Sequence, residues 1–164
     1  GGGSVGLAAA LVLASRGACG VTVADTNAGR RETVSRAGPF TVVDPTEEGA
    51  FEPNAFGLVV DAVGGRATRA AASAAVAPGG VIVHIGLMDN DGGLDVRKFT
   101  LQEVTFIGSY TYTMVDFRAT VDAIQAGVLG DLGWIERRRL DAGATAFDDL
   151  AHGRSAAPKI VLVP

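Results

Sequence analysis

Glycines at the start of the chain have the spacing of a phosphate-binding turn. The sequence begins GGGSVG, in which Gly1, Gly3 and Gly6 fit the pattern G-x-G-x-x-G. The apolar residues that follow recur at helical spacing, so a glycine turn is predicted to open a helix whose buried face holds Val5, Ala8, Ala9, Val12 and Leu13. Such a turn lets a pyrophosphate approach the unpaired N–H groups and the positive dipole end of the helix. Alone the pattern is a weak signal, because any glycine-rich helix start would match it.

Asp25 supplies the second half of a nucleotide-binding pattern. The run VTVAD ends a short β-branched stretch on this residue, at about the distance from the glycines where dinucleotide-binding folds carry an acid. A carboxylate there can accept hydrogen bonds from both hydroxyls of the adenosine ribose. The alternative is that Asp25 only begins the turn-rich segment DTNAG. Glycine turn, helix, strand and acid in this order favour a dinucleotide site.

The charges around Asp25 bear on which dinucleotide would bind. Asp25 would repel a 2′-phosphate, which favours NAD. Arg30 and Arg31 follow closely and could attract that phosphate, so NADP stays open. The two arginines could equally be solvated side chains on the outer face of a helix.

Composition narrows the class of protein and its partners. The chain has 164 residues, 48% of them hydrophobic, which is enough for one domain with a sizeable core. Its net charge of −4 offers no attraction to nucleic acid or to an anionic membrane, so neither partner is expected. Without a long apolar run or a basic leader, we expect a cytoplasmic protein. A lone cysteine, Cys19, excludes an internal disulfide and is predicted to be a small buried residue.

Helical and extended stretches alternate along the chain. Helices are predicted at 5–16, 28–37, 66–77 and 144–151, and strands at 21–24, 41–43, 58–60, 81–86, 103–110, 134–140 and 159–163, with a short further run at 94–96. Pro78-Gly79-Gly80 is predicted to end the third helix. Strands separated by helices of this length predict an α/β fold with a doubly wound parallel sheet.

The first strand of such a sheet is not in the sequence. In the order 3-2-1-4-5-6 that strand is central and leads into the glycine turn, whereas this chain begins at the turn itself. Without it, the strands at Val21 and Leu58 would each lack a neighbouring strand on one edge, and the backbone N–H and C=O groups of that edge would be unpaired. We therefore expect further residues upstream in a longer polypeptide.

Several ordered blocks resemble one family over essentially the whole chain. GGGSVGLAAALVLASRGA, VVDAVGG, PGGVIVHIGL, EVTFIGSYTYT and KIVLVP are similar to the coenzyme domain and tail of the zinc-containing alcohol and polyol dehydrogenases, within the medium-chain dehydrogenase/reductase family. The resemblance implies a Rossmann domain over residues 1–133 and a segment, residues 134–164, that returns to a GroES-like catalytic domain outside this sequence. It also implies a homodimer or homotetramer, with the run at 94–96 pairing across a two-fold axis.

The resemblance assigns cofactor contacts residue by residue. For the adenosine half of the cofactor it implies a pyrophosphate site at Gly1, Gly3, Ser4, Val5 and Gly6, with Asp25 on the ribose and Arg30 against the adenine. For the nicotinamide half it implies Ala62, Val63, Gly64, Ile85, Gly86 and Leu87, with Ser109 and Tyr110 near the carboxamide. From the residues alone, Ile85 and Leu87 could be plain core, and Ser109 and Tyr110 a strand end with local hydrogen bonds.

The chemistry that the resemblance implies needs residues from outside this chain. Zinc lowers the pKa of the alcohol hydroxyl while the nicotinamide takes the hydride, and the family's zinc ligands lie upstream. We therefore predict no catalytic and no metal-binding residue here, and an isolated chain that is inactive. Neither histidine has metal spacing: His84 is predicted to be a core residue with a backbone partner, and His152 to lie near a helix end. Asp148 and Asp149 are predicted to lie on a surface helix.

Three functions stay open from the sequence. The first is a zinc- and NAD-dependent dehydrogenase acting on an alcohol or polyol. The second is a zinc-free NADPH-dependent reductase of quinones or enones, against which Asp25 argues. The third is a module that senses NAD without chemistry. The substrate pocket would be lined largely by the upstream domain, so no particular alcohol is predicted.

Overall fold

The computed structural model describes residues 1–164, which divide into two compact units. The first unit comprises Gly1–Thr46 and Thr113–Pro164, and the second comprises Glu47–Tyr112. Residues 134–164 thus belong to the first unit, and the predicted domain boundary after residue 133 stays a prediction. No helix of either unit is long and apolar enough to span a membrane.

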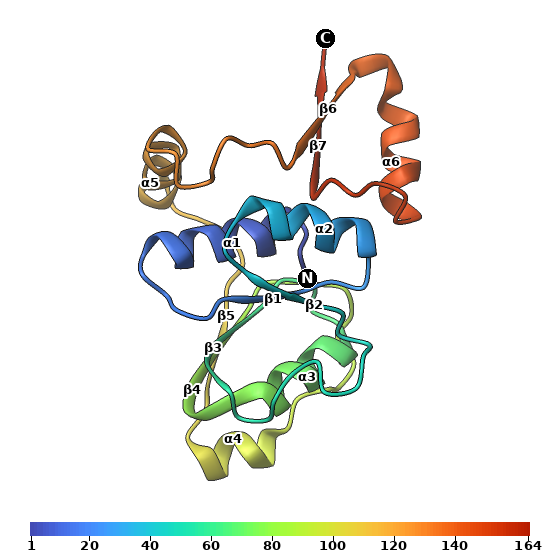
Figure 1. The fold of residues 1–164 in the computed structure, drawn as a ribbon. Helices are drawn as coiled ribbons and strands as arrows, with labels where there is room; N and C mark the ends of the chain where they lie inside the picture. The colour runs from blue at the N-terminus through green and yellow to red at the C-terminus, as the bar shows by residue number, and fades with distance from the viewer. The chain divides into compact units, whose positions relative to one another are not determined.

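The first unit begins with two helices that pack against a pair of parallel strands (Figure 1). These are α1 (Ser4–Ser15), β1 (Thr22–Ala24), α2 (Ala28–Ala37) and β2 (Thr41–Val43). Strands β1 and β2 pair in parallel with Val23 opposite Val42. The Asn27 side chain begins α2 by accepting the Arg30 N–H at 2.9 Å, which satisfies one of the N–H groups left over at a helix start. The predicted helix at 28–37 is therefore confirmed.

The remainder of the first unit holds α5 (Met114–Gln125), β6 (Ile135–Arg139), the short 3₁₀ helix η1 (Leu140–Ala142), α6 (Gly143–Ala151) and β7 (Lys159–Val163). Strands β6 and β7 pair in parallel, with Arg137 opposite Val161. Helix α5 was not predicted. It begins with a capping box in which Thr113 accepts the Asp116 N–H and the Asp116 carboxylate accepts the Thr113 N–H.

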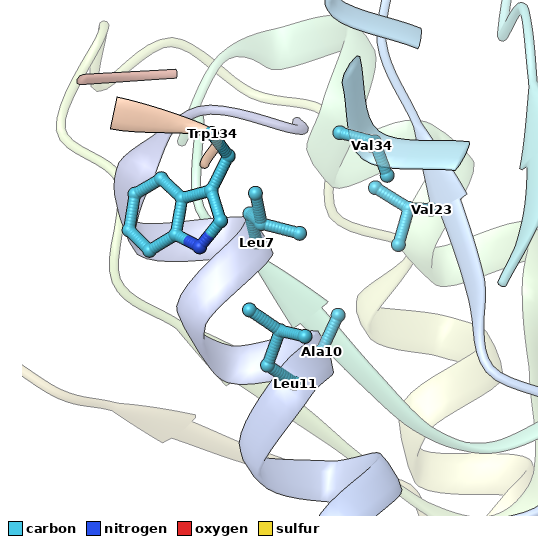
Figure 2. Packing of buried hydrophobic residues seen from close by; sticks show 6 residues of the cluster. All are labelled: Leu7, Ala10, Leu11, Val23, Val34 and Trp134. Carbon is cyan, nitrogen blue, oxygen red and sulfur yellow. The ribbon is translucent and has the colours of Figure 1, made fainter. Parts of the chain in front are cut away.

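The core of the first unit forms around α1. It contains Leu7, Ala10, Leu11, Val23, Val34 and Trp134 (Figure 2). The indole of Trp134 lies beside Leu7, and its Nε1–H donates to the Leu129 carbonyl at 3.1 Å. The predicted buried face of α1 is wrong, since Val5 is half exposed and Leu7, Ala10 and Leu11 are buried instead. Because α1 is apolar on all sides, its sequence period does not select one face.

The second unit is a three-stranded parallel sheet with two helices packed along it (Figure 1). Its elements are β3 (Phe56–Asp61), α3 (Arg66–Ala75), β4 (Val76–His84), α4 (Val96–Gln102) and β5 (Thr105–Gly108). The order is β3-β4-β5, and Ile82 of β4 is fully buried against α3 and α4 residues. In the predicted order 3-2-1-4-5-6, strand 1 is the one outside this sequence, so β1 and β2 correspond to strands 2 and 3, and β3, β4 and β5 to strands 4, 5 and 6. The order within each unit matches this prediction, and the α/β class with parallel strands is confirmed.

Two local predictions in the second unit are wrong. The run at 94–96 is not a strand, because Asp95 accepts the Lys98 N–H at 2.9 Å and so begins α4 at Val96. Helix α3 ends at Ala75, and Pro78-Gly79-Gly80 lies within β4, where a register shift against β3 accommodates it.

Cys19 is also placed differently from the prediction. It is exposed in the loop between α1 and β1, with its thiol 3.7 Å from the Gly17 carbonyl oxygen. The residues around it are exposed as well, because the chain turns through Gly17 and Gly20, both at positive φ.

An ion-pair cluster joins α6 to β6 in the first unit. Arg138 donates to Glu136 at 2.6 Å and to Asp149 at 2.7 Å, and Arg154 pairs with Asp149 at 2.9 Å. The Arg138 hydrogen bond is the largest cause that lowers the pKa of both Glu136 and Asp149. Asp148 and Asp149 lie in α6, and His152 follows its last residue, as predicted.

The cluster predicts an acid-sensitive contribution to stability. Folding lowers the pKa of Glu136 and Asp149, so their contribution is complete above the ordinary carboxyl pKa of about 4 and is lost as the pH falls through the lowered folded values. Denaturant unfolding of the intact protein between neutral and acidic pH should therefore show a shallower loss of stability for Arg138→Met than for the wild type. Arg137→Met, an exposed neighbour on the same strand, should keep the wild-type slope. Equal slopes for wild type and Arg138→Met would contradict this assignment.

Candidate functional site

The start of α1 leaves an open space next to free helix-terminal N–H groups. Gly3 is the N-cap, with φ −68° and ψ −178°, and no side chain caps the helix. A Cβ at Gly3 would meet no protein atom within 4 Å. A side chain at Gly3 would therefore enter open space at the uncapped start of α1, and a helix start of this kind can bind a phosphate.

Asp25 lies directly against this turn. Its Oδ2 accepts the Gly2 N–H at 2.8 Å and its Oδ1 accepts the Asn27 N–H at 2.8 Å, while the residue is only 8% exposed. A Cβ at Gly2 would lie 2.9 Å from Val34 Cγ2, so the close approach requires glycine at this position. The structure thus brings together the glycine turn and the acid that the sequence singled out.

The two arginines after Asp25 have different surroundings. Arg30 Nη1 lies 3.5 Å from Asp25 Oδ2, and its buried Nε has no hydrogen-bond partner. Arg31 Nη1 donates to the Asp25 carbonyl at 2.8 Å and pairs with Asp44 at 2.8 Å. Arg31 is therefore committed to contacts within the protein, whereas Arg30 retains an unused donor beside the turn.

In the second unit, Asp61 joins the ends of two strands. This buried carboxylate accepts the Val63 N–H at 3.0 Å and the Gly64 N–H at 2.8 Å, and its main-chain carbonyl accepts the N–H groups of Ile85 and Gly86 at 2.9 and 3.0 Å. Residues 62–64 and 85–87 are brought together in this way, as predicted for parallel strands that end at the same sheet edge.

Glycines make this approach possible. Gly64 has φ +73°, and a Cβ there would overlap the Gly86 carbonyl, while a Cβ at Gly86 would overlap the Val63 main chain. The sequence reasoning named Gly64 and Gly86 but missed Asp61 and Gly2, which act through contacts with residues more than twenty positions away.

The end of β5 holds the remaining predicted residues. The Ser109 N–H donates to the His84 carbonyl at 2.9 Å, and Tyr110 is 85% exposed. His84 packs against Phe106 with ring centroids 5.4 Å apart, and its Nε2 lies 3.7 Å from Asp61 Oδ2 without a hydrogen-bond partner. The predicted hydrogen bond between His84 and the backbone is therefore absent at Nε2, because this side of the ring lies near the Asp61 carboxylate and the Phe106 ring.

Two shallow hollows in the structure lie elsewhere. One is lined by Pro78, Gly79 and residues 100–103, near the amino-terminal end of β4, and the other by Thr33, residues 133–136, Ala156 and Ala157. Neither is lined by a predicted cofactor residue. No three His, Cys, Asp or Glu side chains lie together as a metal site.

Comparisons with known proteins agree with this architecture. Residues 4–126 match the family of zinc-binding dehydrogenases. D-altritol 5-dehydrogenase from Agrobacterium fabrum is 32% identical over 113 residues, which cover 68% of this chain and 34% of that protein. L-idonate 5-dehydrogenase from Escherichia coli has a TM-score of 0.86 at 19% identity, covering 100% of this chain and 48% of that one. Acetophenone reductase from Geotrichum candidum in complex with NAD has a TM-score of 0.83 at 20% identity, covering 96% and 45%.

These matches fix the family and the fold. The chain spans about a third of the length of the curated relatives it matches. The structural neighbours cover nearly the whole of this chain, so the chain shares the Rossmann-type α/β fold found in these dehydrogenases. With three quarters of its residues within the family match, the chain belongs to the zinc-binding dehydrogenase family.

Proposed function

We propose that this chain is the coenzyme-binding part of an NAD-dependent oxidoreductase that transfers hydride between an alcohol or polyol and the nicotinamide. The observation that carries the proposal is the uncapped start of α1 at Gly3, with open space before it and Asp25 held beside it by the Gly2 N–H. D-altritol 5-dehydrogenase and L-idonate 5-dehydrogenase act, by their names, on polyhydroxylated substrates, which supports the alcohol or polyol class.

In the first unit, the turn and α1 would hold the adenosine half of the cofactor. The pyrophosphate would lie on main-chain N–H groups at the dipole end of α1, with Asp25 accepting from the ribose hydroxyls. The residues proposed for this half are Gly1, Gly3, Ser4, Val5, Gly6, Asp25 and Arg30.

In the second unit, the two joined strand ends would hold the nicotinamide half. The glycines at 64 and 86 let the main chain come close to a flat ring, and Asp61 fixes that main chain in place. The residues proposed for this half are Ala62, Val63, Gly64, Ile85, Gly86, Leu87, Ser109 and Tyr110.

The bound nicotinamide would accept or donate the hydride, and the role of this chain is to orient it. Within the second unit, the strand ends at residues 62–64 and 85–87 would hold the ring in one orientation. Residues that activate the alcohol would come from the zinc-carrying domain that the family resemblance implies upstream.

NAD is the preferred cofactor in this proposal. The carboxylate of Asp25 already accepts two main-chain N–H groups and stays buried, so a 2′-phosphate would face it at close range. The Arg30 guanidinium, which could attract such a phosphate, lies 3.5 Å from Asp25 Oδ2 through its Nη1, so the carboxylate partly neutralises its charge.

The assembly and the compartment belong to the same proposal. Large apolar side chains are exposed along one stretch of the second unit, at Met88, Leu94, Val96 and Leu101, as expected for a surface that a second subunit covers in a homodimer or homotetramer. Cys19 is an exposed free thiol, which is typical of a reducing compartment such as the cytoplasm. Light scattering of the intact protein would test the assembly.

Spectrophotometric assays of the intact protein test the function. The expected result is NADH formation from NAD with polyols or simple alcohols, abolished by a zinc chelator and restored by zinc. Reduction of quinones or enones with NADPH and no zinc requirement would instead indicate the zinc-free reductase. Tight NAD binding without turnover of any alcohol, quinone or enone would indicate an NAD-sensing module.

A further inference from the structure

Arg69 of α3 is a buried cation whose hydrogen-bonding capacity is fully used. It is 6% exposed, and a guanidinium has five N–H donors. All five are satisfied: Nε donates to the Gly92 carbonyl at 2.6 Å, Nη1 to the carbonyls of Gly64 and Asp89 at 2.8 and 2.9 Å, and Nη2 to Asp89 Oδ1 and the Asp91 carbonyl at 2.5 and 2.7 Å. A guanidinium saturated in this way has no donor left for a ligand.

The acceptors of Arg69 belong to two separate segments. Gly64 ends the turn after β3, and residues 89–92 form the loop that follows the end of β4. The same two segments are joined by main-chain bonds, since the Met88 N–H donates to Val63 at 3.1 Å and the Asp89 N–H donates to Gly64 at 3.2 Å. The Gly64 carbonyl thus accepts hydrogen bonds from both the Arg69 side chain and the Asp89 N–H. The turn at residues 63–64 and the segment at residues 88–92 are therefore joined by the Arg69 side chain and by two main-chain hydrogen bonds.

Besides Arg69 and these main-chain bonds, the loop is held at Asp89, whose carboxylate accepts the Arg66 N–H and the Asp91 N–H, both at 3.2 Å. Residues 89–93 are polar and glycine-rich, most of them are exposed, and Gly92 and Gly93 both have positive φ. Such a segment loses much conformational entropy when it is fixed. The Arg69 contacts are charge-assisted and multiple. Its hydrogen bond to Asp89, together with the Arg66 N–H, stabilises the charged carboxylate and lowers the pKa of Asp89 below its ordinary value.

We infer that Arg69 is a positioning residue for the nicotinamide: by tying Gly64 to the loop at 89–92, it sets the main chain of residues 62–64 and 85–87 at the spacing the ring needs. This inference rests on the proposed function, because it takes those residues as the nicotinamide-binding ones. Small displacements of groups that orient a reacting ring weaken its binding and chemistry strongly. The adenosine half of the cofactor, assigned to the first unit, should be insensitive to Arg69.

The chain offers a matched control one turn earlier in the same helix. Arg66 is exposed, and its side chain makes none of the hydrogen bonds or ion pairs found for Arg69. Arg66→Met and Arg69→Met remove the same charge from α3, so a difference between them reports the contacts and not the net charge. Arg69→Lys keeps the charge with only three donors and a different shape, and should lie between the wild type and Arg69→Met.

The test is calorimetric titration of the intact protein with NADH and with ADP-ribose, which lacks the nicotinamide. For Arg69→Met we expect NADH affinity to fall about tenfold while ADP-ribose affinity stays within about twofold of wild type. Arg66→Met should bind both ligands like the wild type. Asp89→Ala removes a side-chain acceptor that is 40% exposed, so it leaves the core intact and should show a smaller loss, about threefold, again for NADH alone.

The outcomes separate this inference from the proposed function. A wild type that binds neither ligand would overturn the proposed function and, with it, the role of Arg69. Suppose that the wild type binds both ligands. The inference alone would then be overturned if Arg69→Met and Asp89→Ala lost affinity for NADH and ADP-ribose equally, or if neither variant lost affinity for NADH. If Arg69→Met does not fold, Asp89→Ala and Arg69→Lys decide the question by the same comparison of NADH affinity with ADP-ribose affinity.

Discussion

Replacing Gly3 with leucine is expected to lower the affinity of the intact protein for NADH by about a hundredfold while leaving the fold intact. A side chain at Gly3 meets no protein atom within 4 Å, and the local φ and ψ are accessible to any residue. The stability change should stay below about 1 kcal/mol, because only a weak N-cap is lost. The side chain would instead fill the space in which the pyrophosphate is proposed to lie.

Titration calorimetry with NADH and thermal unfolding measure the two parts of this prediction. Gly57→Leu is the matched control, since Gly57 lies in β3, also has open space around its Cβ position and is not assigned to the cofactor. Gly57→Leu should bind NADH like the wild type. A Gly3→Leu protein that binds NADH with unchanged affinity would refute the role assigned to the turn.

Changing Asp25 to asparagine is expected to alter both specificity and stability. The preference for NAD over NADP should fall about tenfold, because the charge that repels the 2′-phosphate is lost. The free energy of unfolding should fall by about 1–3 kcal/mol, because the two carboxylate oxygens accept N–H groups from Gly2 and Asn27, and an amide has one oxygen to offer. The amide NH₂ would face one of those donors.

Calorimetric titration with both cofactors and denaturant unfolding separate the two effects. Asp95→Asn serves as the control, because Asp95 caps α4 and asparagine caps a helix about as well. It should change neither the cofactor ratio nor the stability by much. An Asp25→Asn protein with the wild-type ratio of NAD to NADP affinities would show that Asp25 does not contact the ribose.

Much of the fold could be predicted because its signals are local. Helix 28–37 and the strands at 41–43 and 159–163 have the predicted bounds, since a capping Asn27 and short β-branched runs mark their ends within the sequence. The buried face of α1 could not be chosen, because the helix is apolar on all sides. Helix α5 was missed although Thr113 and Asp116 have the spacing of a capping box, a signal that the sequence does contain.

The part of the candidate site that could be predicted from the sequence is the glycine turn at the start of α1 together with Asp25. The adjacency of the glycine turn and Asp25 follows from the order of glycine turn, helix, strand and acid. Gly2, Asp61 and Arg69 were missed because each role includes a contact with a residue more than twenty positions away, which spacing in the sequence does not reveal. In the sequence these are an ordinary glycine, a strand-end acid and an arginine on a helix, and only the packed structure shows what each one holds.

A crystal structure of the intact protein with NADH tests most directly the proposal that the start of α1 binds a dinucleotide. The expected result is a pyrophosphate within hydrogen-bonding distance of main-chain N–H groups at Gly3–Val5, with the Asp25 carboxylate on the adenosine ribose. A cofactor whose pyrophosphate lies away from this turn, or a protein that remains free of NADH at saturating concentration, would contradict it.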